Sequence, residues 1–208
     1  MTRAEPDKRI SAVVIGGSAG SVEGLSSVLP AFHRACGVAI AVVIHLPRER
    51  PSRLAEILAP KCQLPVIEAE DKQPIVPGVV YVAPPDYHLL IDQGPQLALA
   101  ADELVHFSRP SIDVLFESAA DTYRSALLGV ILSGANGDGA AGLSAIARAG
   151  GLTLVQQPEE AVAQAMPRAA IKATPESAVM ALAEIATVLG AIRDGIYPQH
   201  AFSPRVSS

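Results

Sequence analysis

The chain has 208 residues and a mass of 21.5 kDa, and half of its residues are hydrophobic, so it has enough apolar residues for one folded domain and is not a disordered chain. Its net charge of −5 argues against a nucleic-acid or anionic-lipid partner. The two cysteines, Cys36 and Cys62, match no metal-binding spacing. The chain has neither an apolar run of membrane-spanning length nor a signal peptide at its start, so we expect a cytoplasmic protein without direct membrane insertion.

Short apolar runs alternate with amphipathic stretches along most of the chain. The runs at 11–15, 38–44, 127–132 and 152–155 have no polar face, which is typical of strands buried on both sides. Between and after them, hydrophobic residues recur at helical spacing over 22–32, 112–123 and 179–192. This alternation predicts a doubly wound α/β fold, with a mostly parallel sheet and helices on both of its faces.

The middle of the chain interrupts this pattern. Residues 65–100 are rich in proline and glycine, and short alternating segments at 79–82, 87–91 and 96–99 predict a small antiparallel hairpin region at one edge of the sheet. We expect one catalytic domain over residues 11–193, with flexible tails at 1–10 and 194–208.

The first predicted strand leads into a Gly-x-Ser-x-Gly motif, Gly16-Gly17-Ser18-Ala19-Gly20, and a helix follows at once. Small residues on either side of Ser18 permit a tight turn that exposes its hydroxyl, as a nucleophile requires. Two alternatives remain. A dinucleotide site would need Gly-x-Gly-x-x-Gly, which this motif does not supply. The turn could also be purely structural, with Ser18 or Ser21 capping the helix.

A histidine and an aspartate follow two other predicted strands. His45 ends the run at 38–44, and Asp138 lies in a glycine-rich loop after the run at 127–132. The carboxyl ends of parallel strands share one edge of a sheet, so these residues and Ser18 are expected to meet there. Asp138 could instead simply cap the helix that follows it.

The three residue types suit nucleophilic catalysis. A serine hydroxyl needs an imidazole to take its proton, and a carboxylate orients that imidazole and stabilises its charged form. Backbone N–H groups of the two glycine-rich loops, including that of Ala19, are candidates for an oxyanion hole. The sequence therefore predicts a Ser18-His45-Asp138 triad that needs no cofactor and no metal.

Beyond this triad, residues 11–190 resemble the catalytic domain of the chemotaxis protein-glutamate methylesterases, the CheB family. The resemblance rests on ordered blocks: 15–20, 43–47, 68–71 with 77–78, 81–84 with 87–89, 109–116, 132–142 and 166–171. It implies a serine hydrolase that removes methyl esters from glutamate side chains of chemoreceptors, with some members also deamidating glutamines. It places the catalytic roles on the same three residues and an oxyanion N–H on Ala135, where methionine is common in the family.

The implied partners are the methylated cytoplasmic helices of chemoreceptors. Arg48 and Arg109 are candidate substrate-binding residues. Arg48, with Arg50 and Arg53, is expected to meet acidic residues that flank a methylation site, or else to form a solvated helix start. Arg109 precedes a helix whose expected N-cap is Ser111, a position that favours a structural role over docking. Family members commonly carry an amino-terminal receiver domain, and the first strand here starts too early to leave room for one. The alternative function is a receptor-binding adaptor that keeps the fold without the chemistry.

Overall fold

The computed structural model describes residues 7–46 and 51–198 and confirms the α/β fold. Its centre is a seven-stranded sheet in the order β10-β9-β8-β2-β3-β5-β4, and every neighbouring pair is parallel. The strands are β2 (Ala12–Gly17), β3 (Ala39–Ile44), β4 (Val66–Glu68), β5 (Val80–Val82), β8 (Leu127–Ile131), β9 (Leu152–Gln156) and β10 (Ala178–Met180).

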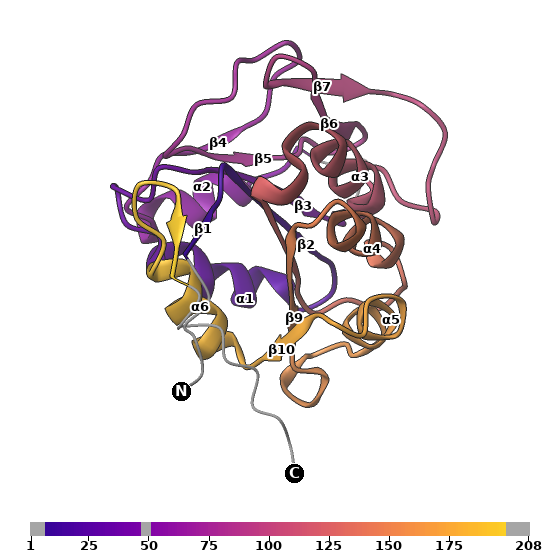
Figure 1. Ribbon diagram of the computed structural model, residues 1–208. Coiled ribbons are helices and arrows are strands. Elements are labelled where there is room, and N and C mark those ends of the chain that lie inside the picture. Colours follow the sequence, from indigo (N-terminus) through magenta and orange to yellow (C-terminus); the bar gives the residue numbers. More distant parts are fainter. Residues whose placement is uncertain (1–6, 47–50, 199–208) are drawn as a thin grey trace, which may run out of the picture.

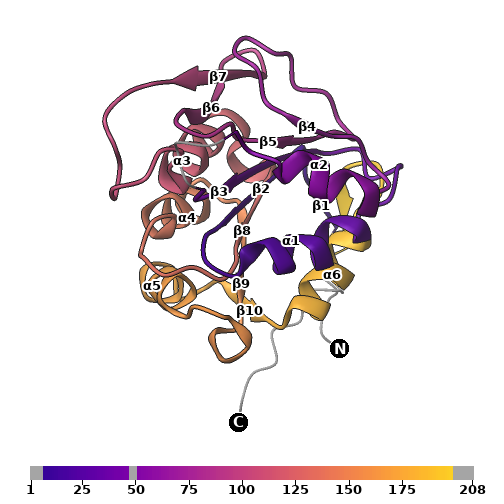
Figure 2. The same ribbon diagram turned by 180° about the vertical axis from the view of Figure 1, so that it is seen from behind.

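Helices cover both faces of this sheet (Figures 1 and 2). On one face lie α1 (Ser21–Val28), α2 (Leu54–Leu58) and α6 (Leu182–Gly190); on the other lie α3 (Ile112–Tyr123), α4 (Ala140–Arg148) and α5 (Ala165–Ala173). Strand β2 shows why two cores form, because its successive side chains point to opposite faces. Val13 and Ile15 pack into the core beneath α1 and α6, whereas Ala12 and Val14 pack into the core beneath α3 and α4.

The middle segment differs in part from the expectation. The predicted antiparallel pair forms, as β6 (His88–Asp92) and β7 (Gln96–Ala100). The segment at 79–82 does not join it: β5 is a fully buried parallel strand of the main sheet between β3 and β4. The β6–β7 hairpin lies next to α3, where the Ser118 hydroxyl accepts the N–H of Ile91. Burial on both faces explains the difference, since β5 carries three consecutive apolar residues and no polar face.

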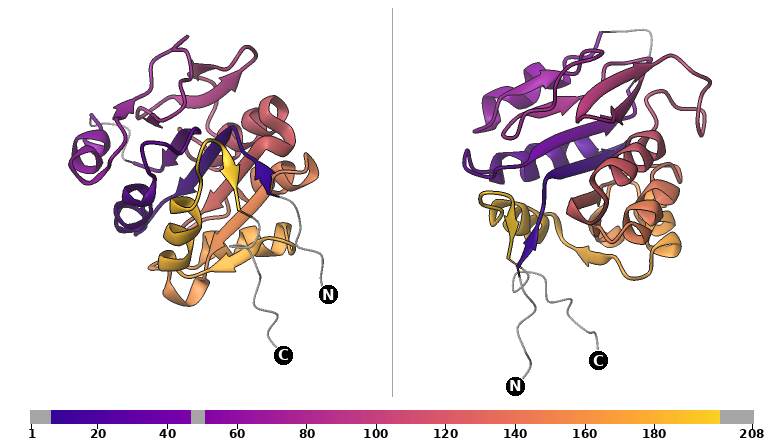
Figure 3. Two further views of the ribbon diagram at one scale, coloured as in Figure 1. Left: turned by 60° about the vertical axis from the view of Figure 1, so that its left-hand side comes forward. Right: turned by 45° about the horizontal axis from the view of Figure 1, so that its top comes forward.

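Residues near both ends of the described chain pair with each other. Strands β1 (Lys8–Arg9) and β11 (Ile196–Tyr197) form a small antiparallel ladder, seen where the yellow end of the ribbon meets the indigo start in Figure 3. Parts of both expected tails are therefore paired, and the domain extends beyond residues 11 and 193. Among the described residues, no helix combines the length and hydrophobicity needed to cross a membrane.

The contact between α3 and α4 gives a test of this packing. A Cβ added at Gly142 would lie 2.5 Å from the Cβ of Phe116 and 3.1 Å from the Cα of Asp113, so backbone would have to move. We expect Gly142→Ala to lower the free energy of unfolding by about 1–3 kcal/mol in urea denaturation. At Gly137 the nearest atom would be the Cβ of Ala169 at 3.6 Å, so Gly137→Ala is the matched control and should change stability by less than about 0.5 kcal/mol. Equal effects of the two substitutions would contradict this account.

Candidate active site

Three neighbouring strands deliver the predicted site residues to one edge of the sheet. Ser18 directly follows β2, His45 directly follows β3, and Asp138 lies in the loop between β8 and α4. Because β2 lies between β8 and β3 and all three run in the same direction, their carboxyl ends are adjacent. The topology therefore places the three residues on one edge, as the strand pattern predicted.

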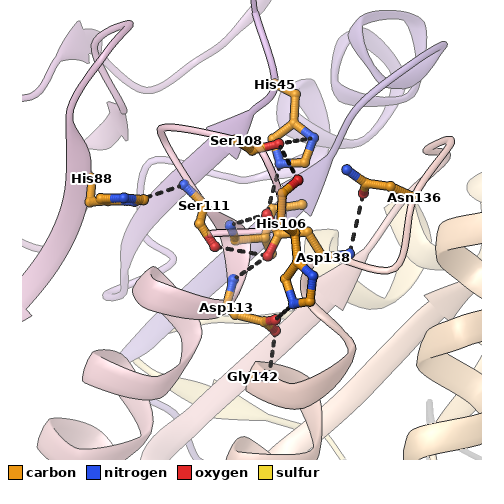
Figure 4. Close-up of polar contacts among 10 residues, drawn as sticks. His45, His88, His106, Ser108, Ser111, Asp113, Asn136, Asp138 and Gly142 are labelled. Carbon is orange, nitrogen blue, oxygen red and sulfur yellow. Dashed lines mark hydrogen bonds and ion pairs between the residues drawn. The ribbon is translucent and has the colours of Figure 1, made fainter. Parts of the chain in front are cut away.

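His45 and Asp138 are in direct contact. His45 Nε2 lies 2.8 Å from Asp138 Oδ2, and the two residues are drawn together in Figure 4. The Asp138 side chain is fully buried, whereas 13% of the His45 side chain is exposed. The carboxylate is thus shielded from water, while the imidazole remains within reach of a bound substrate. Since Nε2 is used by the aspartate, Nδ1 is the nitrogen left to take a proton.

Asp138 also caps a helix, though not the one that follows it in the sequence. Its carboxylate accepts hydrogen bonds from the backbone N–H groups of Ile112 (2.8 Å) and Asp113 (3.0 Å), at the start of α3, and from the Ser111 hydroxyl (2.8 Å). The expected N-cap position, Ser111, is confirmed, but its hydroxyl donates to Asp138 and makes no cap bond of its own. Asp138 therefore caps α3 from a loop 25 residues further along the chain.

These contacts hold Asp138 in its charged form. Burial alone would raise the pKa of the Asp138 carboxyl, but its hydrogen-bond donors, of which His45 contributes most, outweigh burial and hold the pKa below the ordinary aspartate value. The positive end of the α3 dipole acts in the same direction. A carboxylate that is ionised at neutral pH is the partner that an imidazole needs if it is to become positively charged during a reaction.

A second buried carboxylate, Asp113, lies beside the first. Asp113 Oδ1 accepts the N–H of Gly142 in α4 (2.7 Å), and His106 Nε2 lies 3.3 Å from Asp113 Oδ2. Asp138, just before α4, thus caps α3, and Asp113, in α3, caps α4. Burial raises the pKa of the Asp113 carboxyl, and the neighbouring Asp138 charge adds to that effect. The sequence analysis did not single out Asp113, because its role depends on the contact between the two helices.

His106, Asp113 and Asp138 place one ligand-type atom each within 4.8 Å of one another, the spacing of a possible metal site. Each carboxylate oxygen in this cluster already faces at least one hydrogen-bond donor (Figure 4). A cation would have to displace the donors that position α3, α4 and His45. The cluster is better described as a hydrogen-bond network than as a metal centre.

Ser18 is half-buried, and its backbone is held on both sides. Its N–H donates to the carbonyl of Ser133 (2.9 Å), and the preceding carbonyl, that of Gly17, accepts the N–H of His45 (3.3 Å). Among the described residues, the Ser18 hydroxyl makes no hydrogen bond to His45; Nδ1 of His45 instead lies 3.5 Å from the Ser108 hydroxyl. Catalytic hydrogen bonds are often long in unliganded sites, and the role of Ser18 as a nucleophile stays a prediction.

The turn after Ser18 is made by glycine. Gly20 has φ of +78° and is the N-cap residue of α1, and a Cβ there would lie 2.4 Å from the Cβ of Val162. Neither Ser18 nor Ser21 caps this helix; the Ser21 hydroxyl donates to the carbonyl of Ser18. The alternative in which these serines serve as helix caps is therefore not what the structure shows.

The backbone N–H groups of Ala19 and Ala135 have no hydrogen-bond acceptor within the described part of the chain. Both residues are exposed, one just after Ser18 and the other in the loop that leads to Asp138. Backbone N–H groups without an acceptor are the kind of donor that an oxyanion hole requires, and the role of these two remains a prediction.

Ser133 and Gln156 support this arrangement and were missed by the sequence analysis. The buried Gln156 side chain accepts the N–H of Ser133 (2.8 Å), and the Ser133 hydroxyl donates to the carbonyl of Ala19 (2.6 Å). The loop after β8 is thereby joined to the loop that carries Ser18. A buried polar residue in an apolar strand, such as Gln156, was the signal that could have pointed to this link.

Arg109 is engaged within the fold. Its guanidinium donates to Asp86 Oδ1 (2.8 and 3.1 Å) and to the carbonyls of Ala101 and Asp102 (2.7 Å each). These bonds tie down the segment that leads into α3, and a role for Arg109 in substrate binding remains a prediction. Arg48 lies outside the described residues. Arg53, at the start of α2, is exposed and pairs with Glu56 at 2.9 Å.

An α/β domain whose parallel strands bring a serine, a paired histidine and a buried aspartate to one edge has the architecture of a serine-hydrolase-type enzyme. Comparison with known proteins places it more narrowly. Residues 13–189 match the family described as CheB methylesterase. The chain therefore belongs to the CheB methylesterase family and is an enzyme of that class.

The similar proteins agree with this assignment. The chain is 46% identical over 175 residues to a Leptospira interrogans protein named provisionally as a protein-glutamate methylesterase/protein-glutamine glutaminase, covering 84% of this chain and 91% of that protein. A Chromohalobacter salexigens protein-glutamate methylesterase/protein-glutamine glutaminase is 38% identical over 85% of this chain and 51% of its own length. The chain thus spans about half the length of several relatives. The crystal structure of the Thermotoga maritima CheB methylesterase catalytic domain superposes with a TM-score of 0.83 at 31% identity, covering 87% of this chain and 97% of that domain.

The charge on Asp138 makes a prediction about stability and pH. Because its folded pKa is lowered, its ionisation stabilises the fold above the ordinary aspartate value of 3.8, and that contribution disappears as the pH falls below it. We expect Asp138→Asn to lower the free energy of unfolding by about 2–3 kcal/mol at pH 7, with the deficit shrinking below pH 4. Urea denaturation at a series of pH values measures this. Asp121→Asn, on the exposed side of α3, is the control and should change little at any pH; a deficit for Asp138→Asn that does not vary with pH would contradict the prediction.

Proposed function

We propose that this chain hydrolyses glutamate γ-methyl esters on the cytoplasmic helices of methyl-accepting chemoreceptors, using Ser18, His45 and Asp138 as a triad. The observation that carries the proposal is the buried, charge-stabilised Asp138 paired with the Nε2 atom of His45 at the strand edge where Ser18 emerges. Membership of the CheB methylesterase family supports the substrate class. Glutamine deamidation at the same site is the companion activity that the names of its relatives suggest.

The proposed reaction has two stages. His45 Nδ1 takes the proton of the Ser18 hydroxyl as Ser18 Oγ attacks the ester carbonyl carbon, and the imidazolium is stabilised by the ionised Asp138. The tetrahedral intermediate then expels its methoxy group, which receives the proton from His45 and leaves as methanol. Water attacks the acyl-enzyme in the same way and releases the glutamate carboxylate together with free Ser18.

The negative oxygen of each tetrahedral intermediate needs hydrogen-bond donors. The proposed donors are the N–H groups of Ala19, directly after Ser18, and of Ala135, in the loop that leads to Asp138; neither has an acceptor among the described residues. Because they belong to the backbone, the presence of alanine in place of methionine at position 135 leaves the donor unchanged.

A substrate carried on a helix needs an open and partly apolar surface beside the site. Next to His45, Leu46 lines a groove of about 230 Å³ together with Val22, Leu54 and Ile57. Such a groove suits the apolar flank of an amphipathic helix. The adaptor alternative also uses this surface, and the missing hydrogen bond between Ser18 and His45 is the observation in its favour.

Methanol release from a methyl-labelled receptor fragment separates the two functions. We expect Ser18→Ala and His45→Ala to lower the rate at least 1000-fold, because either change removes the proton transfer that activates the nucleophile. Ser27→Ala is the matched control and should retain activity, because Ser27 lies in α1, the helix after Ser18, and its hydroxyl donates to the Glu23 carbonyl. Receptor binding without methanol release from the unmodified chain would favour the adaptor.

The oxyanion donors can be tested by removing one N–H without changing a side-chain role. Ala135→Pro deletes the backbone donor, and we expect kcat to fall about 100- to 1000-fold. Ala135→Ser keeps the N–H and should stay within about threefold of the unmodified chain. Circular dichroism and urea denaturation check that the proline variant is folded. A folded Ala135→Pro enzyme with normal kcat would exclude this N–H from the mechanism.

A further inference from the structure

A two-residue turn beside the active site carries the most exposed large hydrophobic side chain of the described residues. Val105 and Ser108 pair with each other through two backbone hydrogen bonds (2.9 and 3.2 Å), so that His106 and Phe107 form the tip between them. Phe107 is 96% exposed. Figures 1 and 2 both show the connection between β7 and α3, to which this turn belongs, projecting from the body of the domain.

The backbone of this tip is unfavourable for the residues it contains. His106 and Phe107 have φ of +50° and +62°, the left-handed conformation that both central residues of a type I′ turn adopt. Asparagine and glycine are the usual residues there, and a bulky side chain such as phenylalanine is rare with positive φ. Phe107 therefore combines a strained backbone with full exposure of an aromatic ring, and neither feature stabilises the domain. Such outliers are characteristic of functional positions.

The turn is fixed relative to the catalytic histidine. On one side of the tip, the Ser108 hydroxyl lies 3.5 Å from His45 Nδ1, the nitrogen proposed to accept the proton of Ser18. On the other side of Phe107, His106 Nε2 lies 3.3 Å from Oδ2 of Asp113, the buried carboxylate next to Asp138 (Figure 4). Phe107 is thus held between two residues that touch the catalytic network, while its own ring points into solvent.

We propose that Phe107 is a specificity residue that packs against apolar side chains of the substrate helix, one helical turn away from the reacting glutamyl ester. This inference rests on the proposed function and adds to it a preference for substrates with apolar residues next to the ester. On a helix, side chains three and four residues away lie on the same face as the ester. The Phe107 ring, close to the proposed catalytic base, is suited to contact these side chains. The ring would become buried only in the complex with the substrate.

Two synthetic helical peptides test this. Each carries one glutamate γ-methyl ester, with leucine in one peptide and serine in the other at the positions three and four residues to either side. We expect the unmodified enzyme to show a kcat/KM about tenfold higher for the leucine peptide, mostly through KM; tenfold corresponds to about 1.4 kcal/mol.

Substitutions at the tip should remove that preference. For Phe107→Ala and Phe107→Asn, the ratio between the two peptides should fall to nearly one, whereas Phe107→Leu should retain most of it. Asparagine tolerates positive φ, so Phe107→Asn should be at least as stable as the unmodified chain in urea denaturation, which separates loss of specificity from loss of folding. Val76→Ala, an exposed apolar residue in the segment before β5, is the matched control and should keep the tenfold ratio.

Fluorescence anisotropy measures the binding of both peptides to the same variants, which makes the test independent of turnover. A chain that binds the leucine peptide preferentially through Phe107 but releases no methanol would contradict the proposed function and support this inference. Equal dissociation constants for the two peptides in the unmodified chain, or a tenfold ratio that survives in Phe107→Asn, would overturn the inference whatever the esterase activity.

Discussion

The ionised carboxylate of Asp138 is the group on which the site depends. A fully buried charge is costly unless hydrogen bonds compensate it, and here two backbone N–H groups at the start of α3, one hydroxyl and one imidazole supply them. The same bonds fix where α3 begins and which nitrogen of His45 is paired with the carboxylate. The position of α3 and the geometry of the candidate site therefore follow from one set of contacts.

The pairing of Asp138 with α3 has a counterpart in Asp113. Each carboxylate caps a helix to which it does not itself belong, so α3 and α4 are held together at the edge of the sheet where the site lies. The polar network continues through His106 to the turn that carries Phe107. A displacement of α3 would move the aspartate, the histidine and the turn that carries Phe107 together, which links the rigidity of the core to the geometry of the candidate site.

Much of the architecture could be predicted from the chain alone, because fully apolar strands and amphipathic helices in alternation admit few other folds. The same logic placed Ser18, His45 and Asp138 on one edge. The sequence pattern assigned residues 79–82 to the hairpin region, whereas the structure places β5 in the main sheet. A strand of three residues is too short for its sequence to indicate which strand it pairs with. The sequence also predicted flexible tails at 1–10 and 194–208, whereas the structure pairs Lys8–Arg9 with Ile196–Tyr197. A ladder of two residues per strand is too short to show a periodicity in the sequence.

Taken by itself, the sequence determined the fold class and the family resemblance and predicted the residues of the proposed triad, since these depend on local periodicity and on short motifs. Only the tertiary structure decided that Asp138 caps α3 and that Nδ1 of His45 is the nitrogen not paired with Asp138. It alone revealed that Asp113, Ser133 and Gln156 support the site, and that Arg109 is bonded within the fold. These features join residues from separate elements, and side-chain geometry across such distances leaves no signal in the spacing of residues along the chain.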